Sequence, residues 1–226
     1  MHPPLRAVAA LTTAVVLALP LTGCTSGDDW SRPHPEPTAV GAPGPGFVDP
    51  ADPPAPEATA TPRPGSWTGV HPPDGYRVVL LTTGDDRPTK TLVKAVEDWA
   101  EDEHVDLRTV TATHPARLIP SITDALDLHP DLVVSVGNDL VDPLATVTPN
   151  HLSQQFLVVG AELAEPTGNV TAVDWSGASF RGEGLGMSST YDATTFTATR
   201  CAAAIRAGAA AVLTGVTGIV LWLDRH

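Results

Sequence analysis

The 226-residue chain is short of cysteine, basic residues and aromatic residues. Its two cysteines, Cys24 and Cys201, allow one intramolecular disulfide at most, and none if Cys24 is modified. Thirteen basic residues face 26 acidic ones, a formal net charge of −13, and residues 74–226 alone carry −10. A nucleic acid or an anionic lipid headgroup requires a basic face, so neither is expected as a partner.

Catalytic signatures are also missing. His104, His114, His129 and His151 show no HExxH spacing, and Ser176 and Ser179 lie outside any GxSxG elbow. Cys201, followed by three alanines, fits a small buried residue better than a nucleophile. We therefore expect no enzyme activity, no cofactor and no resident metal.

The N-terminus carries an export signal. Arg6 precedes an uncharged stretch, 7–20, which is too short to span a membrane as a mature helix. Leu21-Thr-Gly-Cys24 then resembles a bacterial lipobox, in which the cysteine thiol receives diacylglycerol and the preceding residues are removed. The alternative is an ordinary signal peptide with a chance cysteine. We expect residues 1–23 to be a lipoprotein signal peptide and Cys24 to be the lipidation site. Two acyl chains would hold the protein on the outer face of the cell membrane.

Proline dominates the following segment. Thirteen of the 23 prolines lie between Pro33 and Pro73, among few aliphatic residues. Such a composition predicts a disordered linker over 24–73, extended as polyproline II. Roughly 50 residues at about 3.1 Å each could lift a domain up to ~150 Å from the bilayer.

Residues 74–226 alternate between two hydrophobic periodicities. Apolar runs predict buried strands, and amphipathic or alanine-rich stretches predict helices. The expected strands are 76–81, 106–112, 131–136, 155–160, 169–174 and 219–223, and the expected helices are 89–103, 116–128, 140–150 and 193–213. This order predicts an α/β domain, a doubly wound and mostly parallel sheet in a single flavodoxin-like lobe. The uncharged stretch 207–223 could alternatively insert into a membrane, but its glycines favour a helix, a turn and a strand.

The chain resembles one family of exported binding proteins. The segments that carry the resemblance are 78–86, 130–137, 155–160, 169–173 and 180–183. Their order and spacing are similar to the amino-terminal lobe of the basic membrane protein family, the nucleoside-binding lipoproteins of certain ABC importers. The resemblance implies a type I periplasmic-binding fold, a nucleoside-like ligand held between two lobes, and an ABC permease as partner. Residues 74–226 correspond to one lobe, and the family's ligand-contacting aromatic and amide are absent from residues 87–91.

Polar residues follow three of the expected strands. In a doubly wound sheet, ligands meet the carboxyl ends of the strands where the strand order reverses. The residues expected to gather there are Asp85, Asp86, Asn138, Asp139, Asp174 and Trp175. Carboxylates suit a sugar hydroxyl, an amine, Mg²⁺ or Ca²⁺, and the tryptophan could stack on a ring. Helix capping and turn formation are the structural alternative for each residue.

Two functional classes remain open from the sequence. One is a lipid-anchored binding protein for a small molecule such as a nucleoside or sugar, completed by a second lobe, a second copy or a permease. The other is an envelope interaction or structural lipoprotein whose lobe has lost small-molecule affinity. A single lobe leaves the expected site open to water, which predicts weak affinity unless a partner closes it.

Overall fold

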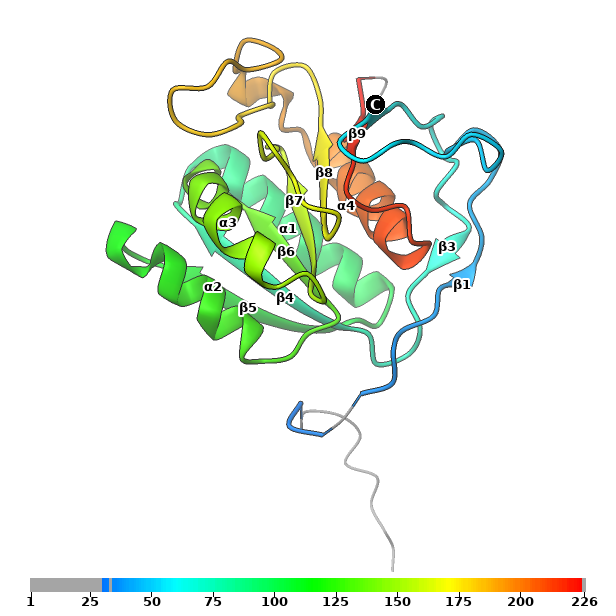
Figure 1. The fold of residues 1–226 in the computed structure, drawn as a ribbon, viewed down its shortest axis with the longest axis horizontal. Coiled ribbons are helices and arrows are strands. Elements are labelled where there is room, and N and C mark those ends of the chain that lie inside the picture. The colour runs from blue at the N-terminus through cyan, green and yellow to red at the C-terminus, as the bar shows by residue number, and fades with distance from the viewer. Residues whose placement is uncertain (1–29, 33, 225–226) are drawn as a thin grey trace, which may run out of the picture.

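The protein forms an α/β fold around one parallel sheet (Figure 1), seen in a computed structural model that describes residues 30–32 and 34–224. All strand pairs in the seven-stranded sheet are parallel, and the order is β2-β9-β8-β7-β6-β4-β5. From β5 inward, this is the doubly wound order 2-1-3-4-5-6, reversing between β4 and β6. The predicted fold class is confirmed.

The sheet strands have the following bounds: β2 (Thr59–Ala60), β4 (Arg77–Thr83), β5 (Asp106–Ala112), β6 (Leu132–Val136), β7 (Gln155–Val159), β8 (Val170–Asp174) and β9 (Val220–Trp222). The α-helices are α1 (Arg87–Asp102), α2 (Leu118–Leu126), α3 (Val141–Val147) and α4 (Ala198–Leu213). Short 3₁₀ turns precede or follow the helices: η1 (Pro115–Arg117), η2 (Asn138–Leu140), η3 (Thr148–Asn150) and η4 (Ala193–Thr195). Six predicted strands and four predicted helices thus recur within a few residues.

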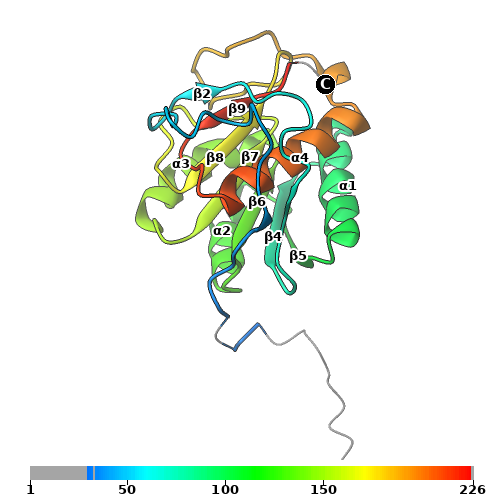
Figure 2. The ribbon, with the colours of Figure 1, turned by 90° about the vertical axis from the view of Figure 1, so that its right-hand side faces the viewer.

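Helices cover both faces of the sheet (Figure 2). On one face, α1 and α4 pack over a core that includes Leu80, Val134 and Leu157. On the other face, α2 and α3 pack with Leu81 and Val133. Successive strand residues point to opposite faces, so strands buried on both sides must be apolar without interruption.

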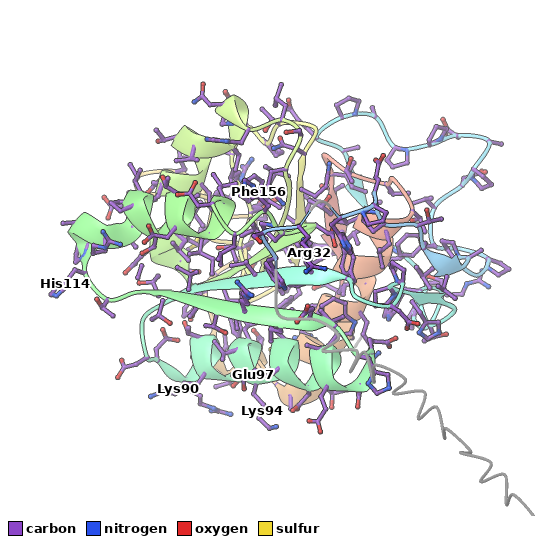
Figure 3. All side chains as sticks on the ribbon, turned by 90° about the horizontal axis from the view of Figure 1, so that it is seen from below. Arg32, Lys90, Lys94, Glu97, His114 and Phe156 are labelled. Atoms are coloured by element: carbon purple, nitrogen blue, oxygen red, sulfur yellow. The ribbon has the colours of Figure 1, made fainter. Side chains whose placement is uncertain are left out.

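Helix α1 shows how the local sequence sets an element. The Asp86 carboxylate accepts a hydrogen bond from the Thr89 amide, and Pro88 lies in the first turn, where no backbone donor is needed. Leu92, Val96 and other apolar residues face the sheet. Figure 3 shows the charged side chains of the opposite face, including Lys90, Lys94 and Glu97, directed away from the sheet, whereas Phe156 lies inside.

The uncharged stretch 207–223 is a helix, a turn and a strand. Helix α4 ends at Leu213, glycines at 215 and 218 adopt positive φ in the turn, and β9 follows inside the sheet. No helix among the described residues is long and apolar enough to cross a membrane.

The proline-rich segment packs against the domain, so the expected disordered linker over 24–73 is wrong for the part that the structure describes. Phe47 and Trp67 are 2% and 4% exposed and belong to the core under α4. Strand β2 extends the main sheet beside β9, while β1 (Val40–Gly41) pairs with β3 (Val70–His71) in an antiparallel ribbon. Proline blocks regular structure, but the few large apolar residues between the prolines still anchor the segment. The folded unit therefore does not begin at residue 74.

Candidate functional site

A crevice lies where the strand order reverses, at the carboxyl ends of β4 and β6. Its volume is about 270 Å³, and its lining comes from four segments of the chain. The lining residues are Thr83, Gly84, Asp86, Pro88, Thr89, Leu92, Gly137, Asn138, Asp139, Val159, Gly160, Tyr191 and Phe196. Three residues predicted for the site, Asp86, Asn138 and Asp139, are therefore together in this crevice.

Asp86 has a structural task as well as a place in the crevice. Its Oδ1 accepts from the Thr89 backbone amide at 3.0 Å, and its Oδ2 accepts from the Thr89 hydroxyl at 2.8 Å. These bonds hold the carboxylate at the start of α1, where the helix dipole favours a negative charge. A ligand would thus meet an Asp86 already fixed by capping.

Asn138 and Asp139 stand on the short turn after β6. Gly137 has φ +111°, and a Cβ there would lie 2.7 Å from the Thr83 carbonyl oxygen, so only glycine brings this turn so close to β4. Within the described part of the chain, no hydrogen bond involves the side chain of Asn138 or Asp139. An amide and a carboxylate without protein partners are suited to meeting a ligand's hydroxyl or amino groups.

Two aromatic side chains, Phe196 and Tyr191, also line the crevice. Phe196 is buried and packs edge-on against Trp175, with ring centroids 5.0 Å apart. Tyr191, 40% exposed, lies 5.9 Å from the Phe196 ring centroid. Burial, and then the negative charge of Asp86, raise the pKa of the Tyr191 hydroxyl. A partly exposed ring that lines the same crevice as amide and carboxylate groups can stack on a flat ligand.

Asp85 and Trp175, both predicted for the site, lie outside the crevice. Asp85 points into solvent, 3.9 Å from the Lys90 ammonium. Trp175 is fully buried in the core and donates from its ring nitrogen to the Thr195 hydroxyl at 3.0 Å. The placement of Trp175 on an open rim is wrong: β8 ends one residue earlier, and the chain turns inward beneath the 176–197 loop.

Asp174 is likewise buried beneath this loop. Its Oδ1 accepts from the backbone amides of Trp175 and Ser179 at 2.8 and 2.7 Å, whereas its Oδ2 is buried without a hydrogen-bond partner among the described residues. Burial, with smaller contributions from Glu162 and Asp224, raises the pKa of Asp174 from 3.8 to about 7 despite the two backbone bonds. Asp174 therefore holds the loop and does not contact the crevice.

Tyr191 and Phe196 were missed by sequence reasoning. They come from the long loop between β8 and α4, which brings both side chains to the crevice. A polar, glycine-rich loop of this length with two aromatics was the available signal, since long structured loops often carry binding residues.

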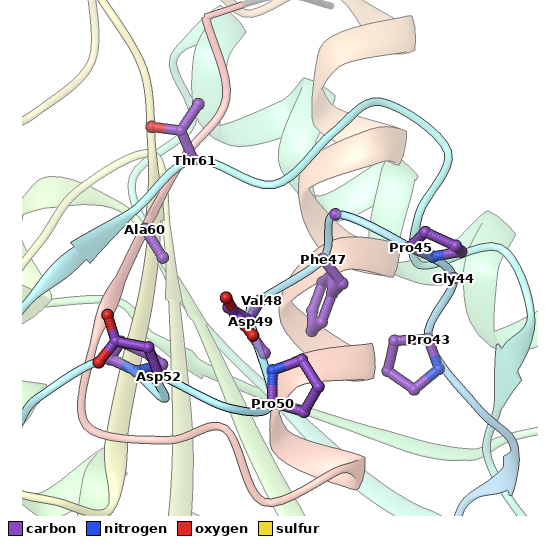
Figure 4. Close-up of a pocket in the computed structure, with 12 residues that line it drawn as sticks. Pro43, Gly44, Pro45, Phe47, Val48, Asp49, Pro50, Asp52, Ala60 and Thr61 are labelled. Carbon is purple, nitrogen blue, oxygen red and sulfur yellow. The ribbon is translucent and has the colours of Figure 1, made fainter.

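A larger cavity, about 880 Å³, lies in the proline-rich segment (Figure 4). Its lining is mostly proline, glycine and apolar side chain, including Pro43, Pro50 and Phe47. Asp49, one of its two carboxylates, already accepts a hydrogen bond from the Ala51 amide at 2.9 Å. Ligand sites combine an apolar wall with several polar groups that converge on the ligand. The smaller crevice has this combination, so it is the better candidate for the binding site.

The side chains that bear on metal and thiol chemistry are those of the described residues alone. No group of three histidine, cysteine or acidic side chains there could hold a metal ion. Cys201 is buried in α4, and burial raises the pKa of its thiol to about 12, which disfavours the reactive thiolate. Cys24 lies outside the described residues, as does the apolar stretch before it.

No family model and no curated protein matches this chain. Among solved structures, it is similar to an ABC transporter solute-binding protein from Aeropyrum pernix K1, at 22% identity over 45% of this chain, with a TM-score of 0.40. A solute-binding protein from Conexibacter woesei matches at 17% identity over 44% of the chain, with a TM-score of 0.38. A periplasmic ribose ABC transporter protein from the same organism matches at 17% identity over 67% of the chain, with a TM-score of 0.34. The matches span 29%, 35% and 55% of those proteins, and TM-scores this low do not assign a function.

Proposed function

We propose that this protein is an extracytoplasmic, lipid-anchored binding protein whose crevice takes a small polyhydroxylated ring compound of the nucleoside or sugar class. The crevice at the reversal of strand order carries this proposal, because Asn138, Asp139 and the ring of Tyr191 line it together. The proposed location depends on the lipobox-like Leu21–Cys24 segment.

The charges in the crevice narrow the ligand class. No lysine, arginine or histidine is among the lining residues, whereas two carboxylates are. A phosphate or carboxylate on the ligand would face like charge without a counter-ion. Uncharged hydroxyls and ring amines can donate to the Asp139 carboxylate and the Asn138 amide oxygen. This favours a nucleoside over a nucleotide and a neutral sugar over a sugar phosphate.

The size of the crevice limits affinity. At about 270 Å³ it is slightly below the range of sites that enclose a drug-sized ligand. A partner that closed the crevice, such as a second copy or a separate second lobe, would remove more of the ligand from water. An ABC permease would be the next component if the protein delivers its ligand for import.

A second candidate is an envelope interaction protein without a small ligand. The small volume of the crevice favours this candidate, because about 270 Å³ is below the usual range of pockets that enclose a ligand. In that case Tyr191, Leu185 and Met187, which are 40%, 51% and 43% exposed around the neighbouring surface, would meet a protein partner instead.

Calorimetry on residues 25–226 would test the proposal. We expect micromolar to millimolar binding of a nucleoside such as adenosine or of a free sugar such as ribose, and at least tenfold weaker binding of the matching phosphate. Tyr191→Ala and Asn138→Ala should weaken binding by about tenfold each, roughly 1.4 kcal/mol. Leu152→Ala, at a solvent-exposed side chain outside the crevice, is the matched control. The proposal would be contradicted if Tyr191→Ala and Asn138→Ala bound the ligand as tightly as Leu152→Ala. It would also be contradicted if no nucleoside or sugar gave a binding heat.

A further inference from the structure

Trp30 fixes the chain to the end of the sheet that is opposite the crevice. Its side chain is 4% exposed, and its ring nitrogen donates to the Asp106 carboxylate at 3.0 Å. The Arg108 guanidinium lies 4.4 Å and the Arg77 guanidinium 5.7 Å from the ring centroid. Stacked guanidinium groups, a hydrogen bond and burial together make this a stable seat for an aromatic ring.

This seat lies at the amino ends of the strands. Arg77 and Asp106 are the first residues of β4 and β5. The Arg77 guanidinium also donates to the backbone carbonyls of Trp30 and Arg32, at 3.4 and 3.2 Å. His34 continues along the same end, with its Nε2 3.0 Å from the carboxylate of Asp131, which directly precedes β6.

The crevice opens at the other end. It lies beyond Thr83, the last residue of β4, so the full length of that seven-residue strand separates it from Trp30. At about 3.3 Å per residue, this strand is ~23 Å long. In Figure 1 the described chain begins at the bottom, whereas the 176–197 loop lies at the top. Figure 3 shows His114, after β5, at one side of the molecule and Arg32 well away from it.

Only six positions separate Trp30 from Cys24. A fully extended chain advances at most about 3.3–3.6 Å per residue, so Cys24 lies within roughly 20–22 Å of the seat. Around the surface, the path from this seat to the crevice is longer than the ~23 Å of the straight strand. With Trp30 seated, Cys24 cannot reach the crevice end of the strands, so its lipid cannot hold the molecule with the crevice pressed flat onto the bilayer.

We propose that the Trp30 seat makes the amino end of the sheet the membrane-facing surface, and that the crevice is held facing away from the bilayer. This inference rests on the lipid-anchored location given under the proposed function. A permease in the same membrane meets the amino end of the sheet and not the crevice. Whatever closes the crevice, a second copy or another partner, approaches from the space beyond the membrane.

Energy transfer on vesicles tests this orientation. The full mature chain is coupled through Cys24 to a maleimide lipid, so the test does not depend on whether cells acylate this cysteine. A donor dye is placed at Asp127→Cys, an exposed position after α2 near the Trp30 seat, or at Thr190→Cys, beside the crevice. The dye is attached first, while Cys24 carries a protecting group. Cys24 is then deprotected and coupled to the lipid. Cys201 is buried and does not compete for either reagent.

With an acceptor in the lipid headgroups, we expect strong transfer from position 127 and at least threefold weaker transfer from position 190. Inserting 20 glycine and serine residues after Ser26 leaves the Trp30 seat intact and should bring the two efficiencies together. Trp30→Ala should act in the same direction, and Trp30→Phe, which keeps the stacked ring, should stay near the wild type. Equal transfer from both positions in the wild type, or a difference that survives the insertion, would overturn the proposal.

Two further measurements separate this result from the proposed function. The mass of Cys24 in protein purified from cells reports natural acylation, and calorimetry reports the ligand. An unmodified Cys24 would contradict the proposed location while the coupled chain still shows the orientation. Ligand binding with equal transfer efficiencies would contradict the orientation and leave the binding proposal standing.

Discussion

Asp174 links burial to pH dependence at the scale of a single residue. The pKa of its carboxyl is raised to about 7, so between about pH 4 and pH 7 the folded protein keeps a proton that the unfolded chain has lost. A group of this kind stabilises the fold at low pH, and that contribution falls as the pH rises through the folded-state pKa.

Asp174→Asn should therefore flatten the pH dependence of stability. From pH 5 to pH 8 the wild type should lose about 3 kcal/mol of unfolding free energy relative to the variant, because at about 1.4 kcal/mol per pKa unit only the interval from pH 5 to the folded-state pKa of about 7 contributes. Urea unfolding at each pH measures this difference, with the exposed Asp127→Asn as control. Parallel stability curves for the wild type and Asp174→Asn would show that this carboxyl does not titrate with folding.

Substitutions at Trp175 and Tyr191 should have different effects, the first on the stability of the fold and the second on ligand binding. Trp175→Ala removes a fully buried ring that packs on Phe196, and should cost about 3–5 kcal/mol of unfolding free energy. Tyr191→Ala changes a side chain that is 40% exposed, and should cost under about 1 kcal/mol while weakening ligand binding. Denaturant unfolding measures the first effect and calorimetry the second. An unchanged free energy of unfolding in Trp175→Ala would contradict the buried position of this ring.

Sequence reasoning could place Asp86, Asn138 and Asp139 because each lies within three residues of the end of a strand, and that end is set by the apolar run of the strand. It could not place Trp175, because a residue after a strand can turn toward solvent or toward the core. The direction depends here on the loop above, whose amides bond to Asp174. The aromatic wall was missed for a related reason: Phe196 reaches the crevice only because Gly160 leaves room, a Cβ there lying 2.6 Å from its ring.

At the scale of elements, α4 packs unusually close to the sheet at Gly208. A Cβ at this position would lie 2.4 Å from Leu157 Cδ1 and 2.9 Å from Val173 Cγ2. Helix propensity favours alanine over glycine by about 1 kcal/mol, whereas overpacking a core costs about 1–3 kcal/mol. The steric cost of the added methyl group should outweigh the gain in helix propensity.

We therefore expect Gly208→Ala to lower the free energy of unfolding by up to about 2 kcal/mol, the overpacking cost less the propensity gain. Thermal and urea unfolding would measure the change. Gly186→Ala, in a loop with no atom within 4 Å of the added methyl, is the matched control and should be close to neutral. A stabilised Gly208→Ala would mean that α4 shifts outward at no cost.

The helices and strands of the second part of the chain were predictable because each element carries its own periodicity. Strand β5 was expected at 106–112 and is found there, and β7 and β8 end within a residue of expectation. The proline-rich segment has no such periodicity. Its packing depends on single aromatics, Trp30, Phe47 and Trp67, whose partners lie far away in the sequence, so composition alone indicated disorder.

At the scale of the whole molecule, residues 30–73 act as a strap around the domain. The strap covers the edge of the sheet at β9 through β2, and it supplies Phe47, Trp67 and Val70 to the core beside α4. An uncovered parallel edge strand is an aggregation hazard, and an unpacked α4 would expose its alanine face. Under the proposed lipid anchor, the strap also shortens the expected spacer of up to ~150 Å to the six positions between Cys24 and Trp30.

A chain that starts at residue 74 should therefore fold poorly, although its own strands and helices are intact. Each lost aromatic side chain in a core costs about 3–5 kcal/mol, and domains of this size have only about 5–15 kcal/mol of stability. We expect residues 74–226 to unfold at a far lower urea concentration than residues 30–226, to bind a dye that reports exposed apolar surface, and to aggregate. Residues 30–226 should match residues 25–226, because the Trp30 seat is retained in both. If the chain from residue 74 unfolded with the same midpoint as the chain from residue 30, the strap would contribute nothing to the fold. The proline-rich segment would then be the flexible spacer expected from the sequence, and the proposed lipid anchor would leave the crevice free to turn toward the membrane.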